Sequence, residues 1–598
     1  MSLPNNRRRD PGGASSEAVL VWVAIVLVVV GVGSVYAAMH LGHRFAGTGA
    51  KVPSDPFSVL FGLLGGDQQW PGPAGWWVLA GVTALLVLLT AGGGLAVHRL
   101  RTRRSRVDRA ASYMGRGRDV QDLTRKRAQA TATRLGVDSS AGVPIGRAVA
   151  NNEPLYGSWE DMHIDIWGPR TGKTTSRAVP AILDAPGSVL VTSNKRDVVD
   201  ATRDVRAKVG PVWVFDPQSI TLEEPSWWWN PLSYVTDEVR AAKLADHFAT
   251  GSRDPGAQTD AYFDPAGQDL LAGLLLAAAL DHRPITDVYT WLTRPTDETA
   301  VDILHEHGYS LTADQVAGVV SAPEKQRGGV FGTAQQMASC LTNRQVAHWV
   351  TPQGLADQRP QFRPEDFVRA DGGTLYSLSK EGRGTAGPLV TALTVAVVEA
   401  AEDLAARSRG GRLGTPLLGV LDEAANVCRW RELPNLYSHY GSRGIVLMTI
   451  LQSWSQGAEV WGESGMKKLW SASNVKVYGG GVSEASFLED LSRMIGDYDR
   501  LSSSTSYGRG HRTVSQQLHR ERILDVADLA ALPKGRAVVM ASGSRPTLIR
   551  TQPWMSGPHA GEVEASIAAH DPQAERTIHE AQREVAAVET TVGAEEAS

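Results

Sequence analysis

Cysteine is nearly absent from this sequence. The 598 residues include two cysteines, Cys340 and Cys428, which form no Cys-x-x-Cys pair. This argues against a cysteine-based metal site, and so few cysteines are typical of a protein in a reducing compartment. Excess charge is lacking as well, because the formal net charge is −4. Overall charge therefore predicts no partner, and the length predicts about two to four domains.

Charged residues are missing from two long runs near the N-terminus, 18–39 and 76–97. Each run has 22 residues, close to the roughly 20 that a helix needs to span a bilayer. The first run could be a signal peptide, but it is long and lacks a convincing small-residue cleavage site. We therefore expect an N-terminal two-helix transmembrane hairpin over 18–97 in a lipid bilayer, with a pair of buried helices as the alternative.

Arginine flanks this hairpin on both sides. Arg7, Arg8 and Arg9 precede it, and six arginines lie between 99 and 109, whereas 40–75 contains Arg44 and Lys51 as its only Lys or Arg residues. The positive-inside rule then places both ends in the cytoplasm and 40–75 outside. The sequence predicts a multi-pass protein of the cell membrane, with residues 1–17 and the body cytoplasmic.

The basic stretch 98–150 follows as a juxtamembrane linker. Its arginines could contact anionic lipid or nucleic acid, but a simple stop-transfer flank explains them equally well.

The next motif reads Gly-Pro-Arg-Thr-Gly-Lys-Thr, at 168–174. Residues 162–167 before it predict a strand, and 175–183 after it predict a helix. Together these parts form a cradle in which backbone N–H groups hold phosphates, a lysine adds positive charge and a threonine ligates Mg²⁺. A structural turn is the alternative. We expect ATP to contact Gly168, Pro169, Arg170, Thr171, Gly172, Lys173, Thr174 and Thr175.

The spacing of this motif departs from the usual G-x-x-x-x-G-K-[ST]. That pattern places a glycine at position 167, where this chain has Trp167, and Gly168 comes one place late. The loop is therefore expected to be tighter or offset.

A second motif begins with an apolar run at 417–421 and ends in Asp422-Glu423. Paired carboxylates after such a strand are the Walker B arrangement. Asp422 is expected to hold Mg²⁺ together with Thr174, and Glu423 to polarise the attacking water. An Asp-Glu pair is weak evidence alone, but with Gly-Lys-Thr in the same chain it predicts a Mg²⁺-dependent ATPase.

Two further residues are candidates around the strand expected at 445–450. Gln452 follows it and can sense the γ-phosphate, or it is an ordinary polar residue at a strand end. Arg443 precedes it and could act as an arginine finger on a neighbouring subunit, although Arg383 and other arginines compete for that role.

Short apolar strands alternate with helices over 151–235 and 370–556, which predicts an α/β domain with a parallel sheet covered on both faces. We expect further strands at 188–193, 211–216, 373–378, 475–478 and 537–541, and helices at 197–208 and 389–406. Residues 236–369 interrupt this pattern with helical periodicity at 240–250, 267–280 and 332–341, which predicts an all-α domain.

The C-terminal segment 557–598 is acidic. Its part from 561 onwards carries nine acidic and two basic side chains. We expect a solvated helix or disordered tail, with a partner-docking peptide as the alternative.

Several separated motifs together resemble the TraD/TraG-type coupling-protein ATPases of conjugative type IV secretion. The similarity spans roughly 150–550 and the membrane hairpin, and no single motif decides it. Besides the spans and the cradle, the matching pieces are 193–197, 214–217, 229–232, 421–424, 443–445, 451–456, 474–478 and 487–496.

This resemblance implies a RecA-like P-loop NTPase domain, a membrane-distal all-α domain and a homo-hexameric ring. It implies ATP-driven recruitment and translocation of DNA, usually a relaxase-linked single strand, towards a type IV secretion channel. By position, Lys173, Thr174, Asp422, Glu423 and Gln452 carry over to the nucleotide site. Arg443 departs from the pattern, because the family's arginine often lies further upstream.

DNA contact is expected to be mostly to phosphate and not sequence-specific. Lys467, Lys468 and Lys476 with Trp461 and Trp470 could face a pore, although a solvated face beside buried tryptophans is the favoured interpretation.

Two alternatives to a conjugative motor remain. One is a DNA-segregation translocase or a protein-secretion ATPase, and the other is a nucleotide-dependent docking receptor with negligible turnover.

Overall fold

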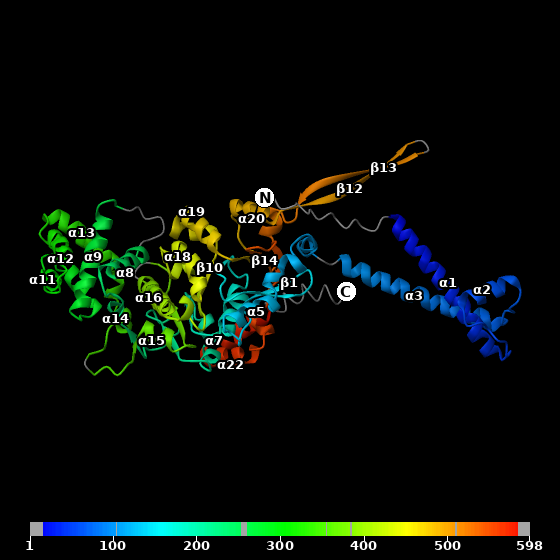
Figure 1. The fold of residues 1–598 in the computed structure, drawn as a ribbon, viewed down its shortest axis with the longest axis horizontal. Helices are drawn as coiled ribbons and strands as arrows, with labels where there is room; N and C mark the ends of the chain where they lie inside the picture. The colour runs from blue at the N-terminus through cyan, green and yellow to red at the C-terminus, as the bar shows by residue number, and fades with distance from the viewer. Residues whose placement is uncertain are drawn as a thin grey trace. The chain divides into compact units, whose positions relative to one another are not determined.

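The computed structural model describes residues 16–102, 105–252, 260–354, 356–382, 385–508 and 511–583. These residues form two units, which Figure 1 shows as ribbons. One unit comprises 16–109 and 496–523, and the other comprises 110–495 and 524–583. Residues 1–15, Arg383 and the end of the acidic segment lie outside the described residues.

The first unit begins with the helices α1 (Ser16–Ala46), α2 (Pro56–Gly65) and α3 (Pro73–Thr102). α1 and α3 pack along each other, and a Cβ at Gly42 of α1 would lie 2.7 Å from Pro71 Cγ. The Asp55 carboxylate starts α2 by accepting a 2.8 Å hydrogen bond from Ser58 N. Both predicted runs are therefore helical, and the segment between them contains a helix of its own.

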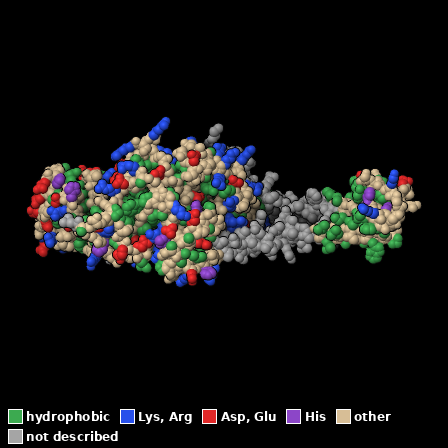
Figure 2. All heavy atoms as spheres, turned by 90° about the horizontal axis from the view of Figure 1, so that it is seen from below, with side chains coloured by type: hydrophobic (Ala, Val, Ile, Leu, Met, Phe, Trp, Pro, Cys, Tyr) green, Lys and Arg blue, Asp and Glu red, His purple; other side chains and the backbone are tan. Residues whose placement is uncertain are grey.

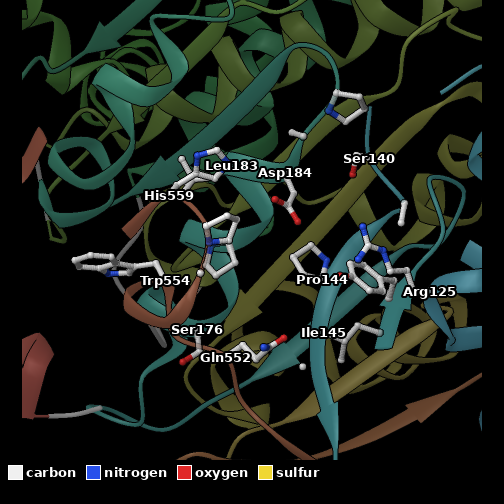
Figure 3. A pocket seen from close by; sticks show the side chains of 18 of the residues that line it. Arg125, Ser140, Pro144, Ile145, Ser176, Leu183, Asp184, Gln552, Trp554 and His559 are labelled. Atoms are coloured by element: carbon white, nitrogen blue, oxygen red, sulfur yellow. The ribbon is translucent and has the colours of Figure 1, made fainter. Parts of the chain in front are cut away.

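Large apolar side chains on this helical hairpin are exposed, as the right end of Figure 2 shows. Among the side chains that the structure describes, 21 large apolar ones are exposed, and fourteen of these lie between Ile25 and Leu89. Among the described residues, one helix is long and apolar enough to cross a membrane, α9 (Phe263–Leu280), and it is half buried within the protein. The side chains of 18–24 and 90–97 are outside the description, so the two predicted spans stay a prediction.

The first unit also contains a long antiparallel hairpin. β12 (Asp497–Gly508) and β13 (His511–Arg522) pair over their whole length, from Asp497 opposite Arg522 to Gly508 opposite His511. Serine, threonine, glutamine and charged residues together dominate this segment, and no strand was predicted there because such a sequence has no apolar alternation.

The second unit is built on a mixed sheet of eleven strands, ordered β2-β1-β15-β14-β11-β3-β10-β9-β4-β8-β5. The run from β11 to β5 is parallel and the remaining four strands add antiparallel pairs. The parallel strands are β11 (Val475–Tyr478), β3 (His163–Ile166), β10 (Ile445–Leu451), β9 (Leu417–Leu421), β4 (Val189–Ser193), β8 (Thr374–Leu378) and β5 (Val212–Phe215). Each lies within one or two residues of a predicted strand.

The antiparallel strands differ from the prediction. β14 (Arg536–Ala541) was expected, whereas β1 (Val143–Ala148), β2 (Pro154–Gly157) and β15 (Thr547–Arg550) were not. The three missed strands are short, and two contain proline, which is confined to edges and irregular pairings in sheets.

Helices cover both faces of this sheet. Val446, Met448 and Ile450 of β10 belong to one buried cluster with α6 (Val179–Asp184), α7 (Asp197–Arg206) and α22 (Ala560–His570). Thr449 lies between them and bonds at 3.0 Å to Tyr437 of α18 (Leu433–Tyr440). Because neighbouring strand residues face opposite ways, α18 covers the other face, and α16 (Gly387–Arg407) also packs on the sheet.

α22 differs from the expected solvated helix or disordered tail. Val563 and Ile567 of this helix are buried, and the Ser566 hydroxyl donates a 2.6 Å hydrogen bond to Asp200 O of α7. Only about one apolar residue per turn produces this packed face, which is too sparse for the sequence pattern to reveal. The start of the acidic segment is therefore part of the folded body.

Helices occupy most of the predicted all-α range and gather together in Figure 1. They are α8 (Glu238–Gly251), α9, α10 (Ile285–Leu292), α11 (Thr299–Glu306), α12 (Ser310–Val320), α13 (Glu324–Met337) and α14 (Arg344–Val350). α15 (Pro364–Arg369) leads back to β8. The domain boundaries themselves stay a prediction.

Candidate nucleotide site

Three adjacent parallel strands end at the candidate site. β10 lies between β3 and β9, with Leu451 opposite Ile166 and Thr449 opposite Leu421. The phosphate loop follows β3, Asp422 and Glu423 follow β9, and Gln452 follows β10. Parallel strands present their carboxyl ends at one edge of a sheet, where ligands bind in such folds. The strand order therefore brings together motifs that are 250 residues apart, as the contact between Lys173 and Glu423 shows.

The phosphate loop is a tight turn that leads into a helix. Arg170 and Gly172 have φ angles of +59° and +89°, in the left-handed region. The Thr171 hydroxyl donates a 2.6 Å hydrogen bond to Gly168 O. The helix begins with a π-helical turn, Thr174–Ala178, and continues as α6. A turn of this kind before a helix N-terminus presents backbone N–H groups to an anion.

Trp167 does not intrude on the loop. Its side chain is fully buried in a cluster with Val475, Val477 and Val539. A Cβ at Gly479 would lie 2.0 Å from the Trp167 ring, and a Cβ at Gly168 would lie 2.0 Å from Gly481 O. The glycines 479–481 after β11 therefore make room for the indole and for the start of the loop. The missing glycine is compensated by glycines on the neighbouring strand end.

One buried carboxylate holds both ends of the loop. Asp165 Oδ1 accepts hydrogen bonds from Trp167 Nε1 at 3.3 Å and from Arg177 Nε at 2.8 Å, and Oδ2 accepts from Arg177 Nη2 at 3.1 Å. The Asp165 and Arg177 side chains have no exposed area. His163 lies beside them, and burial together with the Arg177 charge keeps the pKa of His163 well below its usual range. No sequence pattern predicts this group, because Asp165 and Arg177 belong to different elements and meet only in the folded chain.

Lys173 lies against both Walker B carboxylates. Its Nζ is 3.2 Å from Asp422 Oδ1 and also forms an ion pair with Glu423 Oε1. The carboxylates are almost completely buried. Burial alone would lower the pKa of Lys173, but the two carboxylates outweigh it and raise that pKa. Burial raises the pKa of Asp422 to about 6, against the opposing effect of Lys173.

Glu423 has three side-chain donors around its carboxylate. Besides Lys173, Gln452 Nε2 donates to Oε1 and to Oε2 at 2.8 Å each, and Asn426 Nδ2 donates to Oε2 at 3.2 Å. The backbone of Glu423 is left-handed, with φ +54°. A non-glycine residue in this conformation is uncommon, and such strain clusters at functional sites.

Asp422 and Thr174 fit the expected Mg²⁺ site. Asp422 Oδ1 is buried, and its contact among the described residues is the ion pair with Lys173 at 3.2 Å. Thr174 begins the helical turn after Lys173. A carboxylate and a hydroxyl, completed by water and phosphate oxygens, form the oxygen-rich set that Mg²⁺ prefers. Among the described residues no group of three or more His, Cys, Asp or Glu could hold a metal ion by itself, so phosphate oxygens are needed to complete the set.

Arg443 lies at the other end of β10 from Gln452. It ends the turn Gly441–Arg443 before the strand and pairs with Glu402 Oε1 at 2.8 Å. β10 has 7 residues, which corresponds to about 23 Å at the usual rise per residue. Within one subunit Arg443 is therefore remote from the phosphate loop, and a role on a neighbouring subunit stays a prediction.

The lysines and tryptophans that were expected to face a pore lie in different surroundings. Lys467 and Lys468 are exposed, and Lys468 donates a 2.6 Å hydrogen bond to Asn435 Oδ1. Lys476 instead lies 6.0 Å from the centre of the buried Trp470 ring. Trp461 Nε1 donates a 2.8 Å hydrogen bond to Trp430 O. This arrangement corresponds to solvated lysines beside a buried tryptophan.

A family model matches part of the chain. Residues 416–534 match the model described as the TraM recognition site of TraD and TraG. This segment includes Asp422, Glu423, Asn426 and Gln452. The resemblance to TraD/TraG-type coupling proteins is confirmed over this segment. No curated protein matches the chain.

Several solved structures are similar to the chain. Bacterial conjugative coupling protein TrwBdeltaN70, in an unbound form, is 18% identical, covers 68% of this chain and 88% of its own, and has a TM-score of 0.48. Plasmid coupling protein TrwB in complex with the ATP analogue ADPNP is 17% identical, with 66% and 85% coverage and a TM-score of 0.47. VirB4 of Thermoanaerobacter pseudethanolicus is 13% identical, with 71% and 98% coverage and a TM-score of 0.39. Identities and TM-scores this low assign no residue role in this chain.

Proposed function

We propose that this chain is a membrane-anchored ATPase of the TraD/TraG coupling type, with a RecA-like P-loop NTPase domain. It couples DNA, protein or both to a conjugative type IV secretion channel. The observation that carries the proposal is the convergence of Lys173, Asp422, Glu423 and Gln452 beside a phosphate loop at one edge of a parallel sheet. The family match over 416–534 supports the coupling-protein assignment.

The loop residues 168–175 bind the triphosphate of ATP. Their backbone N–H groups and the helix N-terminus neutralise the phosphate charge. Lys173 turns from Asp422 and Glu423 to the phosphates, because a triphosphate offers the ammonium a stronger partner than two carboxylates that also have other donors. Thr174 and Asp422 hold Mg²⁺, which when bound supplies Lewis-acid stabilisation of the phosphate oxygens.

Glu423 is then free to act as general base. Its carboxylate loses the Lys173 ion pair while keeping Gln452 and Asn426 as donors. An oxygen released in this way can accept a hydrogen bond from water and orient it for attack on the γ-phosphate. Gln452 contacts Glu423 directly, which supports its proposed role in sensing the state of the nucleotide.

The helical hairpin of α1 and α3 anchors the protein in the cell membrane. The exposed apolar side chains between Ile25 and Leu89 support this assignment, because soluble surfaces rarely carry a large contiguous apolar patch. The arginine-rich flanks place both termini and the ATPase body in the cytoplasm.

The remaining parts of the proposal follow from the coupling-protein resemblance. They are a homo-hexameric ring, non-specific contact with single-stranded DNA, a relaxase as partner and an arginine finger in trans at Arg443. Phosphate contacts of this kind make DNA binding strongly dependent on salt.

The substitution Glu423→Gln tests the proposal. It removes the general base but keeps the size of the side chain and an oxygen for Gln452. We expect ATP binding to be retained, hydrolysis to fall by about 100-fold or more, and DNA transfer to be lost. Nucleotide binding, turnover and conjugative transfer are measured on the same variant.

Glu365→Gln is the matched control, because Glu365 is exposed on α15 and remote in sequence from the site motifs. Full DNA transfer by Glu423→Gln in spite of lost hydrolysis would refute the motor function, whereas undiminished hydrolysis would refute Glu423 as the general base.

A nucleotide-dependent docking receptor with little turnover is the second candidate. The observation that favours it is the set of three donors that already surrounds Glu423. This alternative predicts ATP binding without turnover, with or without single-stranded DNA, and transfer that still depends on Lys173.

A further inference from the structure

The loop after β8 is fixed to the sheet edge by one amide side chain. Gln218 Oε1 accepts hydrogen bonds from the Ser379 hydroxyl at 3.0 Å, from Lys380 N at 2.9 Å and from Ala386 N at 3.2 Å. Gln218 follows β5, the strand next to β8. The described ends of this loop are therefore held in place by a neighbouring strand end.

Glu381 connects this loop to two further strand ends. Its Oε1 accepts from Asn194 Nδ2 at 2.7 Å and from Asn426 Nδ2 at 3.0 Å. Asn194 follows β4, and Asn426 lies in the short helix α17 (Ala424–Val427) directly after Glu423. Glu381 is exposed, so a carboxylate at the surface reaches the elements beside the hydrolysis site.

Asn426 links Glu381 to the general base. The same amide nitrogen that donates to Glu381 also donates to Glu423 Oε2 at 3.2 Å. An asparagine amide carries two N–H donors, so one can serve each carboxylate. Side-chain hydrogen bonds then run without a break from Glu381 through Asn426 and Glu423 to Gln452.

Lys173 and Asn426 each bond one oxygen of Glu423, so Asn426 alone distinguishes the two oxygens once Lys173 has left. Gln452 bonds Oε1 and Oε2 equally, at 2.8 Å each. Lys173 takes Oε1 and Asn426 takes Oε2. When Lys173 turns to phosphate, Oε1 loses a partner while Oε2 keeps Asn426. The oxygen left for water is therefore Oε1, and the Asn426 bond fixes which way the carboxylate presents it.

We propose that Asn426 and Glu381 are positioning residues for hydrolysis: Asn426 orients the Glu423 carboxylate, and Glu381 holds the Asn426 amide from the loop after β8. This inference rests on the proposed function, in which Glu423 activates water. In this proposal both residues act through Glu423 and not through contact with nucleotide. A displacement of the Glu381 carboxylate then changes turnover through Asn426 without changing how tightly nucleotide binds.

The test measures kcat, KM and nucleotide affinity in the full-length protein in detergent for Asn426→Ala, Glu381→Ala and the double variant. We expect Asn426→Ala to lower kcat by about tenfold, which equals about 1.4 kcal/mol, with nucleotide affinity unchanged within about twofold. Glu381→Ala lowers kcat by about threefold, because Asn426 keeps its bond to Glu423. The double variant matches Asn426→Ala, since Glu381 acts only through that amide.

Glu381→Gln is the conservative rescue, because its amide oxygen still accepts from Asn194 and Asn426, and we expect near-wild-type turnover. Asn435→Ala and Glu365→Ala are matched controls on exposed residues of α18 and α15. A purely structural role predicts losses in Glu381→Ala and Asn426→Ala that multiply in the double variant.

If the losses of kcat multiply in the double variant, or if Asn426→Ala keeps the wild-type kcat, this inference is overturned and the proposed function is not. A wild-type protein that binds ATP without hydrolysing it overturns the proposed function together with this inference. Loss of nucleotide affinity in Asn426→Ala also overturns the inference, because it would place Asn426 in the binding site.

Discussion

The phosphate loop is held by two buried ion-pair groups that differ in their geometry. In the first, Arg177 pairs with Asp165, and Trp167 also donates a hydrogen bond to Asp165. At the loop, Lys173 pairs with Asp422 and Glu423. We call the first group the loop floor and the second the loop mouth. The floor has no exposed side-chain area in its ion pair, whereas Lys173 at the mouth keeps 13%.

The two groups differ in whether the cation can exchange its carboxylate partner for another anion. The Arg177 guanidinium is planar and places its donors on Asp165 and on Pro144 O in fixed directions, which suits a permanent contact. The Lys173 ammonium is a point charge on a flexible stem, and it faces two carboxylates at once. In the proposed function, Lys173 exchanges the two carboxylates for a phosphate, while Asp422 binds a cation and Glu423 keeps its amide donors. The floor would then fix the loop, and the mouth would rearrange on nucleotide binding.

Asp165→Asn is expected to have the largest effect on stability. It leaves the Arg177 charge buried without a counter-charge, which typically lowers the free energy of unfolding by about 3–5 kcal/mol. Thermal unfolding of the full chain in detergent measures this change.

Two controls accompany Asp165→Asn. The double variant Asp165→Leu/Arg177→Met should recover much of the loss, because an apolar pair replaces both charges. Asp366→Asn removes the partner of Arg369 in an exposed ion pair and should change stability by less than about 1 kcal/mol. Equal losses in Asp165→Asn and Asp366→Asn would contradict the distinction between floor and surface.

Asp422→Asn tests the mouth through its pH dependence. The pKa of Asp422 rises from 3.8 to about 6 in the folded protein, so the folded state binds the proton more tightly than the unfolded chain. The contribution of Asp422 to stability is therefore complete below pH 4 and is lost as the pH rises through 6, by about 3 kcal/mol.

The measurement is the unfolding midpoint of wild type and Asp422→Asn between pH 4 and pH 8, without nucleotide or Mg²⁺. The wild type should lose stability relative to the variant as the pH rises across this window. Parallel curves for the two proteins would show that Asp422 ionises normally at the mouth.

The sequence predicted the parallel part of the sheet well. Leu417–Leu421 and Val475–Tyr478 are strands at the predicted residues. The first is an apolar run, the second alternates valine with Lys476 before a tyrosine, and each has strand length and is followed by a polar or glycine residue. β15 and β12 were missed for different reasons. β15 is four residues long, and the sequence of β12 lacks the alternation of apolar and polar residues that indicates a strand.

The candidate site was predictable where a motif lies directly after a strand. Lys173, Asp422 and Gln452 meet because their strands are neighbours, and short apolar strands before each motif already indicated a parallel sheet. Asp165 and Glu381 could not be found in this way. Their partners depend on strand order and on side-chain directions, and neither is expressed in local periodicity.

Trp167→Phe makes the smallest change and separates the hydrogen bond of the floor from its packing. Phenylalanine keeps an aromatic ring against Gly479 but removes the indole N–H that donates to Asp165 Oδ1 at 3.3 Å. Because Arg177 still satisfies both Asp165 oxygens, we expect a stability loss of about 1 kcal/mol with unchanged nucleotide affinity, measured by thermal unfolding and nucleotide titration. Trp159→Phe is the matched control, since the indole of this buried tryptophan donates to Ser140 O at 3.4 Å, away from the loop. A clear fall in nucleotide affinity for Trp167→Phe alone would mean that the floor, like the mouth, takes part directly in binding.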